Sequence, residues 1–255
     1  MLTLTLDRAE FHNAFNAELI AELDSALTAA ARDESLRAVV LTGSGRSFSA
    51  GADLAWMRAQ AEATESENRA DAVHLADMLR HLNFFPVPTI ARVNGHAFGG
   101  GVGLLACCDI AIAARSARFG LTEARLGLVP AVISPYVISA IGERQARRYF
   151  MTAERFDADQ AQRIGLVHEV VDEAELDNAV EEVIEALRAG GPKAVPACKS
   201  LVFDVTEQSE DRQAALDAHN AALIARLRVS PEGQEGLAAF LDKREPDWRA
   251  PEDDN

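Results

Sequence analysis

Two glycine-bearing turns are the segments of this sequence that could best stabilise a developing negative charge. They are Ser49–Leu54, with the sequence SAGADL, and Asn94–Gly101, with the sequence NGHAFGGG. Both precede segments with helical spacing, so each turn would place free backbone N–H groups where a helix dipole begins. One N–H group from each turn can together hold a carbonyl oxygen that becomes negative during a reaction. Either turn alone is also compatible with close chain packing, and the presence of both favours a site.

Glu123 is the acid–base candidate beside these turns. It stands in the mainly apolar stretch FGLTEARLGLVP, residues 119–130. Desolvation in such surroundings would raise the pKa of its carboxyl group and let it exchange protons near neutral pH. The alternative interpretation is a surface glutamate at the start of a helix, paired with Arg125.

The sequence contains no complete motif for dinucleotide binding, a serine nucleophile, a phosphate-binding loop or a metal site. Gly101–Ala106 matches the letters of a dinucleotide-binding fingerprint, but residues 94–99 separate it from the preceding strand. A nucleophile elbow around Ser47 would need a glycine at position 49, where the sequence has Ser49, and none of the three lysines stands in a phosphate-binding loop. The six histidines show no metal-ligand spacing, so we expect no metal site.

Charge and composition narrow the possible partners. The 255 residues include 25 basic and 40 acidic side chains, a formal net charge of −15. Such a surface repels nucleic-acid phosphates and anionic lipids, so we expect neither nucleic-acid nor membrane partners. Residues 151–189 contribute −8 of this charge, which is typical of a solvated helix face. The N-terminus resembles no targeting signal and the three cysteines form no disulfide framework, which favours a cytoplasmic location.

Alternating strands and helices must position the candidate residues. Leu2–Leu6 and short apolar runs at 38–41, 89–93 and 109–113 have the pattern of strands. Asn16 has the position of a helix N-cap, and Thr64 with Glu67 predicts a capping box. The order of these elements predicts α/β architecture with mostly parallel strands.

The pattern becomes helical beyond Pro130. The predicted helices are Glu143–Met151, Asp172–Leu187, Pro192–Val205, Gln208–Val229 and Pro231–Lys243. The breaker Gly190-Gly191-Pro192 predicts a division into an α/β core, residues 1–190, and a C-terminal helical region, residues 191–255.

Four segments of the sequence resemble the crotonase, or enoyl-CoA hydratase/isomerase, superfamily. They are FSAGADL (48–54), NGHAFGGGVGL (94–104), CDIAIA (108–113) and FGLTEARLGLVP (119–130). The resemblance implies the α/β crotonase fold, a spiral of β-β-α units with a C-terminal helical trimerisation region. It also implies a homotrimer or a dimer of trimers. The implied substrate is an acyl-CoA thioester, with coenzyme A as part of the substrate and no separate cofactor.

The resemblance also implies roles for particular residues. The N–H groups of Ala52 and Gly100 match the pair that holds the thioester oxygen, and Glu123 matches a catalytic glutamate. Polarising the thioester would stabilise an enolate, so that the α-carbon can gain or lose a proton. The implied substrate-binding and CoA-binding residues are Arg46, Ala50, Gly51, Asp53, Leu54, Gly99, Gly103, Ala131, Phe240 and Lys243.

One departure from the family pattern bears on the reaction. Hydratases of this family usually carry two glutamates, and Gly103 stands where the first would be. A family GAGG stretch is also replaced, by AVISPY at residues 131–136. Ser134, Tyr136 or the substrate's own carboxylate could substitute for the missing group. Arg125 and His96 are the candidates for binding such a substrate carboxylate.

The narrower wording of the motifs resembles methylglutaconyl-CoA and isohexenylglutaconyl-CoA hydratases. We therefore expect hydration of a branched 2-enoyl-CoA, with 3-methylglutaconyl-CoA as the specific substrate. The alternative is double-bond isomerisation with Glu123 as the only proton shuttle. An RNA-binding scaffold and a serine peptidase are further alternatives, which the net charge and the need for a Ser–His pair respectively disfavour.

Overall fold

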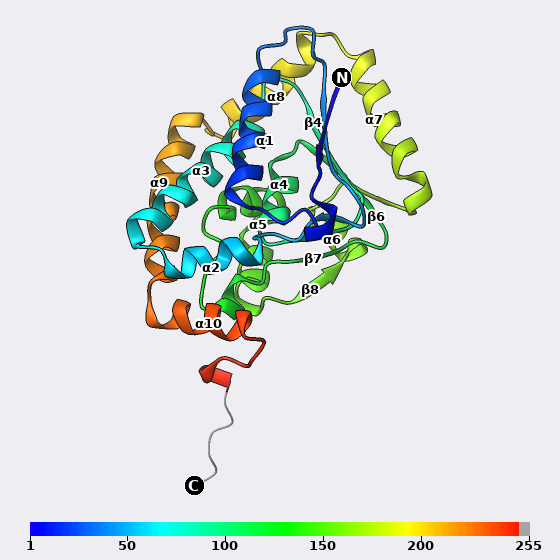
Figure 1. Ribbon diagram of the computed structural model, residues 1–255. Helices are drawn as coiled ribbons and strands as arrows, with labels where there is room; N and C mark the ends of the chain where they lie inside the picture. The colour runs from blue at the N-terminus through cyan, green and yellow to red at the C-terminus, as the bar shows by residue number, and fades with distance from the viewer. Residues whose placement is uncertain (250–255) are drawn as a thin grey trace.

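The computed structural model describes residues 1–249, which form two β-sheets surrounded by helices (Figure 1). The larger sheet is parallel, with strand order β1-β2-β4-β6-β9. Its strands are β1 (Leu2–Leu6), β2 (Val39–Gly43), β4 (Thr89–Val93), β6 (Ile110–Ala114) and β9 (Glu169–Val171). The smaller sheet has the order β3-β5-β7-β8, and its β7–β8 pair is antiparallel. Its strands are β3 (Ser47–Ser49), β5 (His96–Phe98), β7 (Arg118–Gly120) and β8 (Arg155–Asp157).

The chain winds through both sheets as a spiral. Each of the pairs β2–β3, β4–β5 and β6–β7 adds one strand to the larger sheet and the next to the smaller sheet. Helices follow each pair: α2 (Leu54–Glu62) and α3 (Glu65–Asn83), then α4 (Gly100–Cys107), then the 3-10 turn η2 (Glu123–Leu126) and α5 (Ser134–Thr152). The predicted spiral of β-β-α units is thereby confirmed. Both glycine turns lie where a short strand of the smaller sheet leads into a helix.

Capping side chains fix the starts of two helices, as the sequence predicts. The Asn16 side chain accepts a hydrogen bond from the Leu19 amide at the start of α1 (Ala17–Ala30). Thr64 and Glu67 form the predicted capping box of α3. These are short-range hydrogen bonds between neighbouring residues, which is why the sequence pattern identifies them.

The C-terminal helices are α7 (Leu176–Ala189), α8 (Ala194–Val205), α9 (Glu210–Arg228) and α10 (Pro231–Leu241), after the short α6 (Ala158–Arg163). The predicted breaker at 190–192 is the connection between α7 and α8. Figure 1 shows α9 beside α3 and α10 below α2, and these pairs are in contact. Ala221, Ile224 and Leu237 belong to the main hydrophobic core. Residues 1–190 and the helices α9 and α10 therefore share one core.

Some element boundaries differ from the predictions. The helix predicted from Glu143 begins at Ser134, and it contains a break at Gly142, where φ is 74°. The helix predicted from Asp172 begins at Leu176, because residues 173–175 form a 3-10 turn. No helix within residues 1–249 combines the length and the apolar character that a membrane crossing requires.

Candidate active site

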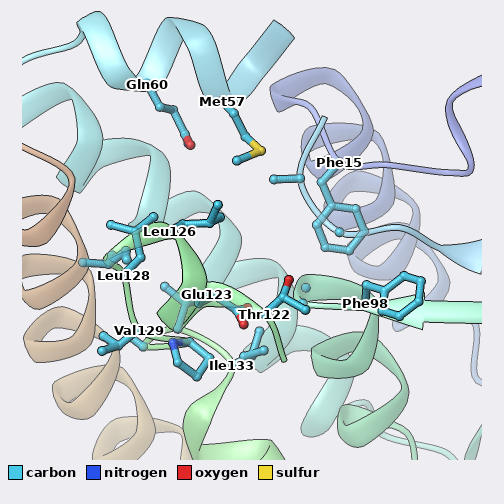
Figure 2. A pocket seen from close by; sticks show the side chains of 18 of the residues that line it. Phe15, Met57, Gln60, Phe98, Thr122, Glu123, Leu126, Leu128, Val129 and Ile133 are labelled. Carbon is cyan, nitrogen blue, oxygen red and sulfur yellow. The ribbon is translucent and has the colours of Figure 1, made fainter. Parts of the chain in front are cut away.

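A cavity of about 350 Å³ lies between the two glycine turns, η2 and the last two helices. Eight of the predicted site residues line it: Ala50, Gly51, Ala52, Gly99, Gly100, Glu123, Ala131 and Phe240. Most of the remaining lining is apolar, including Phe15, Met57, Phe98, Leu126, Leu128, Val129 and Ile133. Figure 2 shows these side chains around Glu123. The cavity is therefore suited to an apolar ligand segment next to one carboxyl group.

The two glycine turns lie against each other at this cavity. A Cβ built on Gly51, where φ is 87°, would lie 2.8 Å from the carbonyl oxygen of Phe98 and 3.6 Å from the backbone nitrogen of Gly100. Only a glycine tolerates both this backbone conformation and this close approach. The two turns are therefore in direct contact, although they lie far apart in the sequence.

The backbone N–H groups of Ala52 and Gly100 are unpaired. Phe15 donates its N–H to the Gly51 carbonyl at 2.6 Å and accepts from the Asp53 N–H at 2.8 Å. Phe15 therefore pairs with Gly51 and Asp53, and the N–H of Ala52 between these two residues takes no part in the pairing. Within residues 1–249, neither Ala52 nor Gly100 donates its N–H to a protein acceptor. Two free donors on adjacent turns can hold one oxygen that becomes negative.

Asp53, predicted to contact substrate, caps helix α2 and does not line the cavity. Its side chain accepts hydrogen bonds from the amides of Ala55 and Trp56 and forms an ion pair with Arg8 at 3.1 Å. Burial acts to raise the pKa of Asp53, but these amides and Arg8 outweigh it and the net pKa is lowered. Asp53 is buried outside the cavity and fixes the start of α2, directly after Ala52.

Glu123 is the first residue of η2, and its carboxyl group is buried in the cavity wall. Its Oε2 atom is inaccessible and makes no hydrogen bond to residues 1–249. Burial raises the pKa of Glu123 from 4.5 to about 7, against a lowering hydrogen bond from its own amide. Arg125 is exposed and forms no ion pair with it, so the interpretation as a paired surface glutamate is wrong.

Gly99 brings the carboxyl group and the second glycine turn together. A Cβ on Gly99 would lie 3.1 Å from Oε1 of Glu123, and its φ of 49° lies in the left-handed region. Any side chain at this position would press against the catalytic candidate. The acid–base group is therefore within contact distance of the turn that carries the Gly100 N–H.

Gly103 lies outside the cavity, and Ile133 fills the space beside it. A Cβ on Gly103 would overlap Cγ2 of Ile133 and lie 2.8 Å from its Cβ. Among the cavity-lining residues that the structure describes, Glu123 is the one acidic side chain. Ser134 and Tyr136, predicted as possible substitutes for a second carboxylate, do not line the cavity. Single-carboxylate chemistry is what this arrangement permits.

Three residues predicted to contact coenzyme A lie outside the cavity of the single chain. Arg46, Leu54 and Lys243 are exposed, and Arg46 lies 3.2 Å from the His12 ring. Phe240, 47% exposed, lines the cavity. His96 is exposed outside the cavity, where its ring accepts a hydrogen bond from the amide of Arg118, so it is not placed to bind a ligand there.

The polar cavity residues Gln60, Thr122, Arg155 and Arg228 were not found from the sequence. Gln60 enters from α2 and Arg228 from the end of α9. No sequence signal distinguishes Arg228 from Arg226, its exposed neighbour on the same helix. Among residues 1–249, no cluster of His, Cys, Asp or Glu side chains is arranged to hold a metal ion.

Comparisons with known proteins agree with this geometry. A family model described as enoyl-CoA hydratase/isomerase matches residues 1–251. The 2,3-dehydroadipyl-CoA hydratase of Escherichia coli is 36% identical over 98% of this chain and 95% of its own. The 1,2-epoxyphenylacetyl-CoA isomerase of the same organism is 31% identical over 97% of this chain and 94% of its own. An enoyl-CoA hydratase structure from Shewanella pealeana has a TM-score of 0.78 and 47% identity, covering 97% of this chain and 92% of the other.

Proposed function

The chain belongs to the enoyl-CoA hydratase/isomerase family, and from that membership we propose that it adds water across the double bond of a 2-enoyl-CoA thioester. One observation carries the proposal. The carboxyl group of Glu123, whose buried Oε2 atom has no hydrogen-bond partner among residues 1–249, lines the same cavity as the unpaired N–H groups of Ala52 and Gly100. These are the groups that a proton transfer next to a thioester carbonyl requires.

Glu123 serves in turn as base and acid in the proposed reaction. Its carboxylate accepts a proton from water while the water oxygen bonds to the β-carbon. The π electrons of the double bond move onto the thioester oxygen, which the N–H groups of Ala52 and Gly100 hold. Glu123 then returns the proton to the α-carbon and the thioester carbonyl re-forms. The net change is one added water, and a pKa of about 7 suits a group that does both steps.

The specific substrate we propose is 3-methylglutaconyl-CoA, the branched 2-enoyl-CoA that the motif wording suggests. The E. coli relative named above as a 2,3-dehydroadipyl-CoA hydratase supports a dicarboxylic acyl group. The homotrimer or dimer of trimers and the cytoplasmic location remain predictions.

The test is product identification with purified protein. A panel of 2-enoyl-CoA thioesters, including crotonyl-CoA and 3-methylglutaconyl-CoA, is incubated with the protein and followed by mass spectrometry and ultraviolet absorbance. We expect a product that gains the mass of one water as the absorbance of the conjugated thioester disappears. A product of unchanged mass with a shifted double bond would show that the protein is not a hydratase.

Isomerisation is the second candidate, and the single carboxylate favours it. Moving a double bond requires one group that removes a proton and returns it to another carbon, without any water. The E. coli relative named as an isomerase is consistent with this alternative. Its signature in the same experiment is a deconjugated enoyl thioester of unchanged mass.

A further inference from the structure

The apolar cavity has a polar end formed by Gln60 and Arg228. Gln60 is only 4% exposed, and its Nε2 atom is buried without a hydrogen-bond partner in residues 1–249. Asn68, which is fully buried, joins the two residues. Its Nδ2 donates to the backbone carbonyl of Gln60 at 2.9 Å, and its Oδ1 accepts from Nη1 of Arg228 at 3.3 Å. Asn68 thus links the guanidinium group of Arg228 to the backbone of Gln60, and both residues line the cavity.

The charge of Arg228 has no carboxylate partner in the cavity. No acidic side chain of residues 1–249 forms an ion pair with it, and Asp71 acts on its charge only from a longer distance. Burial lowers the pKa of Arg228 to about 10, which reflects its apolar surroundings. A desolvated cation and an unpaired amide are both costly unless a ligand supplies the missing acceptor.

The unpaired Ala52 amide and Gln60 lie near opposite ends of helix α2. Ala52 precedes the helix at its N-terminus, and Gln60 follows Asp53 by seven residues, about 10 Å along the axis. Met57 and Gln60 extend from α2 into the cavity that Glu123 lines (Figure 2). A short acyl chain with hydrogen bonds at both ends can span this distance. The two ends of the cavity therefore match the two ends of one ligand.

We propose that Arg228 and Gln60 bind a carboxylate at the distal end of the acyl chain, so that the protein selects acyl-CoA thioesters of dicarboxylic acids. The proposal rests on the proposed function in that an acyl-CoA thioester occupies this cavity. Arg228 donates charge-assisted hydrogen bonds to the carboxylate oxygens, and Nε2 of Gln60 donates a further one. An uncharged chain leaves both groups desolvated and unpaired, which is the basis of discrimination.

Binding of saturated thioesters tests this assignment without any reaction. The ligands are three pairs matched in chain length: succinyl- and butyryl-CoA, glutaryl- and pentanoyl-CoA, and adipyl- and hexanoyl-CoA. Dissociation constants are measured by calorimetry on the full-length protein. We expect the dicarboxylic member to bind more tightly, by about 10- to 100-fold, in the pair whose length fits, which is the scale of hydrogen bonds to a charged group.

Three variants identify the residues responsible. Arg228→Gln should abolish the preference for the carboxylate, and Gln60→Leu should reduce it by a smaller factor. Arg226→Gln is the matched control, because Arg226 is exposed on the same helix and does not line the cavity. A purely structural role for Arg228 would weaken binding of both members of a pair equally, so the ratio within each pair is the decisive readout.

The outcomes separate this inference from the proposed function. No preference for a carboxylate in any pair, or a preference that survives Arg228→Gln, overturns the inference. Hydration of crotonyl-CoA together with that result leaves the proposed function standing. An Arg228-dependent preference in a protein that hydrates no enoyl thioester supports the inference and removes the proposed hydration.

Discussion

At the scale of single residues, Glu123 has a buried carboxyl group that lines the cavity and forms no ion pair within residues 1–249. Its carboxyl group lies in an apolar wall, and the buried Oε2 atom has no partner among residues 1–249. The lost solvation accounts for the raised pKa, because the charged form loses more by burial than the neutral form. A structural carboxylate would instead be paired, as Asp53 is with Arg8.

The rate of hydration should rise with pH through the pKa of Glu123. The first step needs the carboxylate, so we expect kcat/KM to increase with an inflection near pH 7 and then reach a plateau. Glu123→Gln should lower kcat at least about 100-fold and remove the inflection. Glu182→Gln, on the exposed face of α7, is the control and should match the wild type. A pH-independent rate between pH 5 and pH 9 would contradict the assignment.

The same shift predicts a pH-dependent effect on stability. The pKa of Glu123 is higher in the folded than in the unfolded chain, so its contribution is present below pH 4.5 and lost as pH rises through about 7. The free energy of unfolding of Glu123→Gln should therefore increase relative to wild type from pH 5 to pH 8, by at most about 3 kcal/mol. Urea unfolding at both pH values measures it, and a difference independent of pH would show that the carboxyl group is not desolvated.

Gly103 and Ile133 should behave as a coupled pair. Gly103→Ala would force a Cβ into Ile133 and should lower the free energy of unfolding by about 1–3 kcal/mol. Ile133→Ala opens a space and should cost about 2–5 kcal/mol. In the double variant the new methyl group occupies part of that space, so the cost should be smaller than the sum. Additive costs in urea unfolding would show that the two side chains do not share this space.

At the scale of elements, the helix starts set the positions of the unpaired amides of Ala52 and Gly100. The N-cap of α2 is Asp53, one residue after Ala52, and α4 begins at Gly100 itself. Any displacement of these helix starts would move the N–H groups away from a common oxygen. The capping hydrogen bonds therefore stabilise the helix and orient the site at the same time.

Asp53→Ala should affect both stability and activity. The loss of its bonds to the amides of Ala55 and Trp56 should lower the free energy of unfolding by about 0.5–2 kcal/mol. We also expect a lower kcat, because the Ala52 amide is no longer fixed. Thr64→Ala removes the cap of α3 and serves as the control, since it should cost similar stability and leave kcat unchanged. Equal effects of the two variants on kcat would contradict a role of Asp53 in orienting the site.

At the scale of the whole molecule, the negative charge and the cavity are separated. Within residues 151–189 the acidic side chains are exposed, apart from half-buried Glu154, which confirms a solvated face. The cavity is lined by Arg125, Arg155 and Arg228 and by one acidic residue. A protein with a net charge of −15 thus surrounds its cavity with local positive charge, which suits an anionic thioester.

The shared core predicts that the C-terminal helices unfold together with the spiral. Leu237 of α10 is 2% exposed in the main core, so Leu237→Ala should lower the free energy of unfolding by about 2–5 kcal/mol. Fluorescence can be followed separately at Trp56 and Trp248, the two tryptophans, in variants that retain one of them. We expect coincident urea transitions at both positions. An earlier transition at Trp248 would indicate that the C-terminal helices form a separate unit.

The sequence by itself determined the features that depend only on residues close together in the chain. The helix caps at Asn16 and Thr64 and the two glycine turns are visible because their hydrogen bonds and backbone conformations are local. Glu123 stands out because the residues around it are apolar. Residue patterns did not reveal the individual strands of the smaller sheet, since strands of three residues show no periodicity and exist only through pairing with distant segments.

The tertiary structure decided which side chains share the cavity. Arg226 and Arg228 point to nearly opposite faces of α9, because an α-helix turns about 100° per residue. Packing of α9 against α3 selects the face that is buried, and so Arg228 meets Gln60 through Asn68. Ile133 likewise fills the space beside Gly103 only because α4 and α5 pack together. Such contacts join residues far apart in the chain, and no local pattern records them.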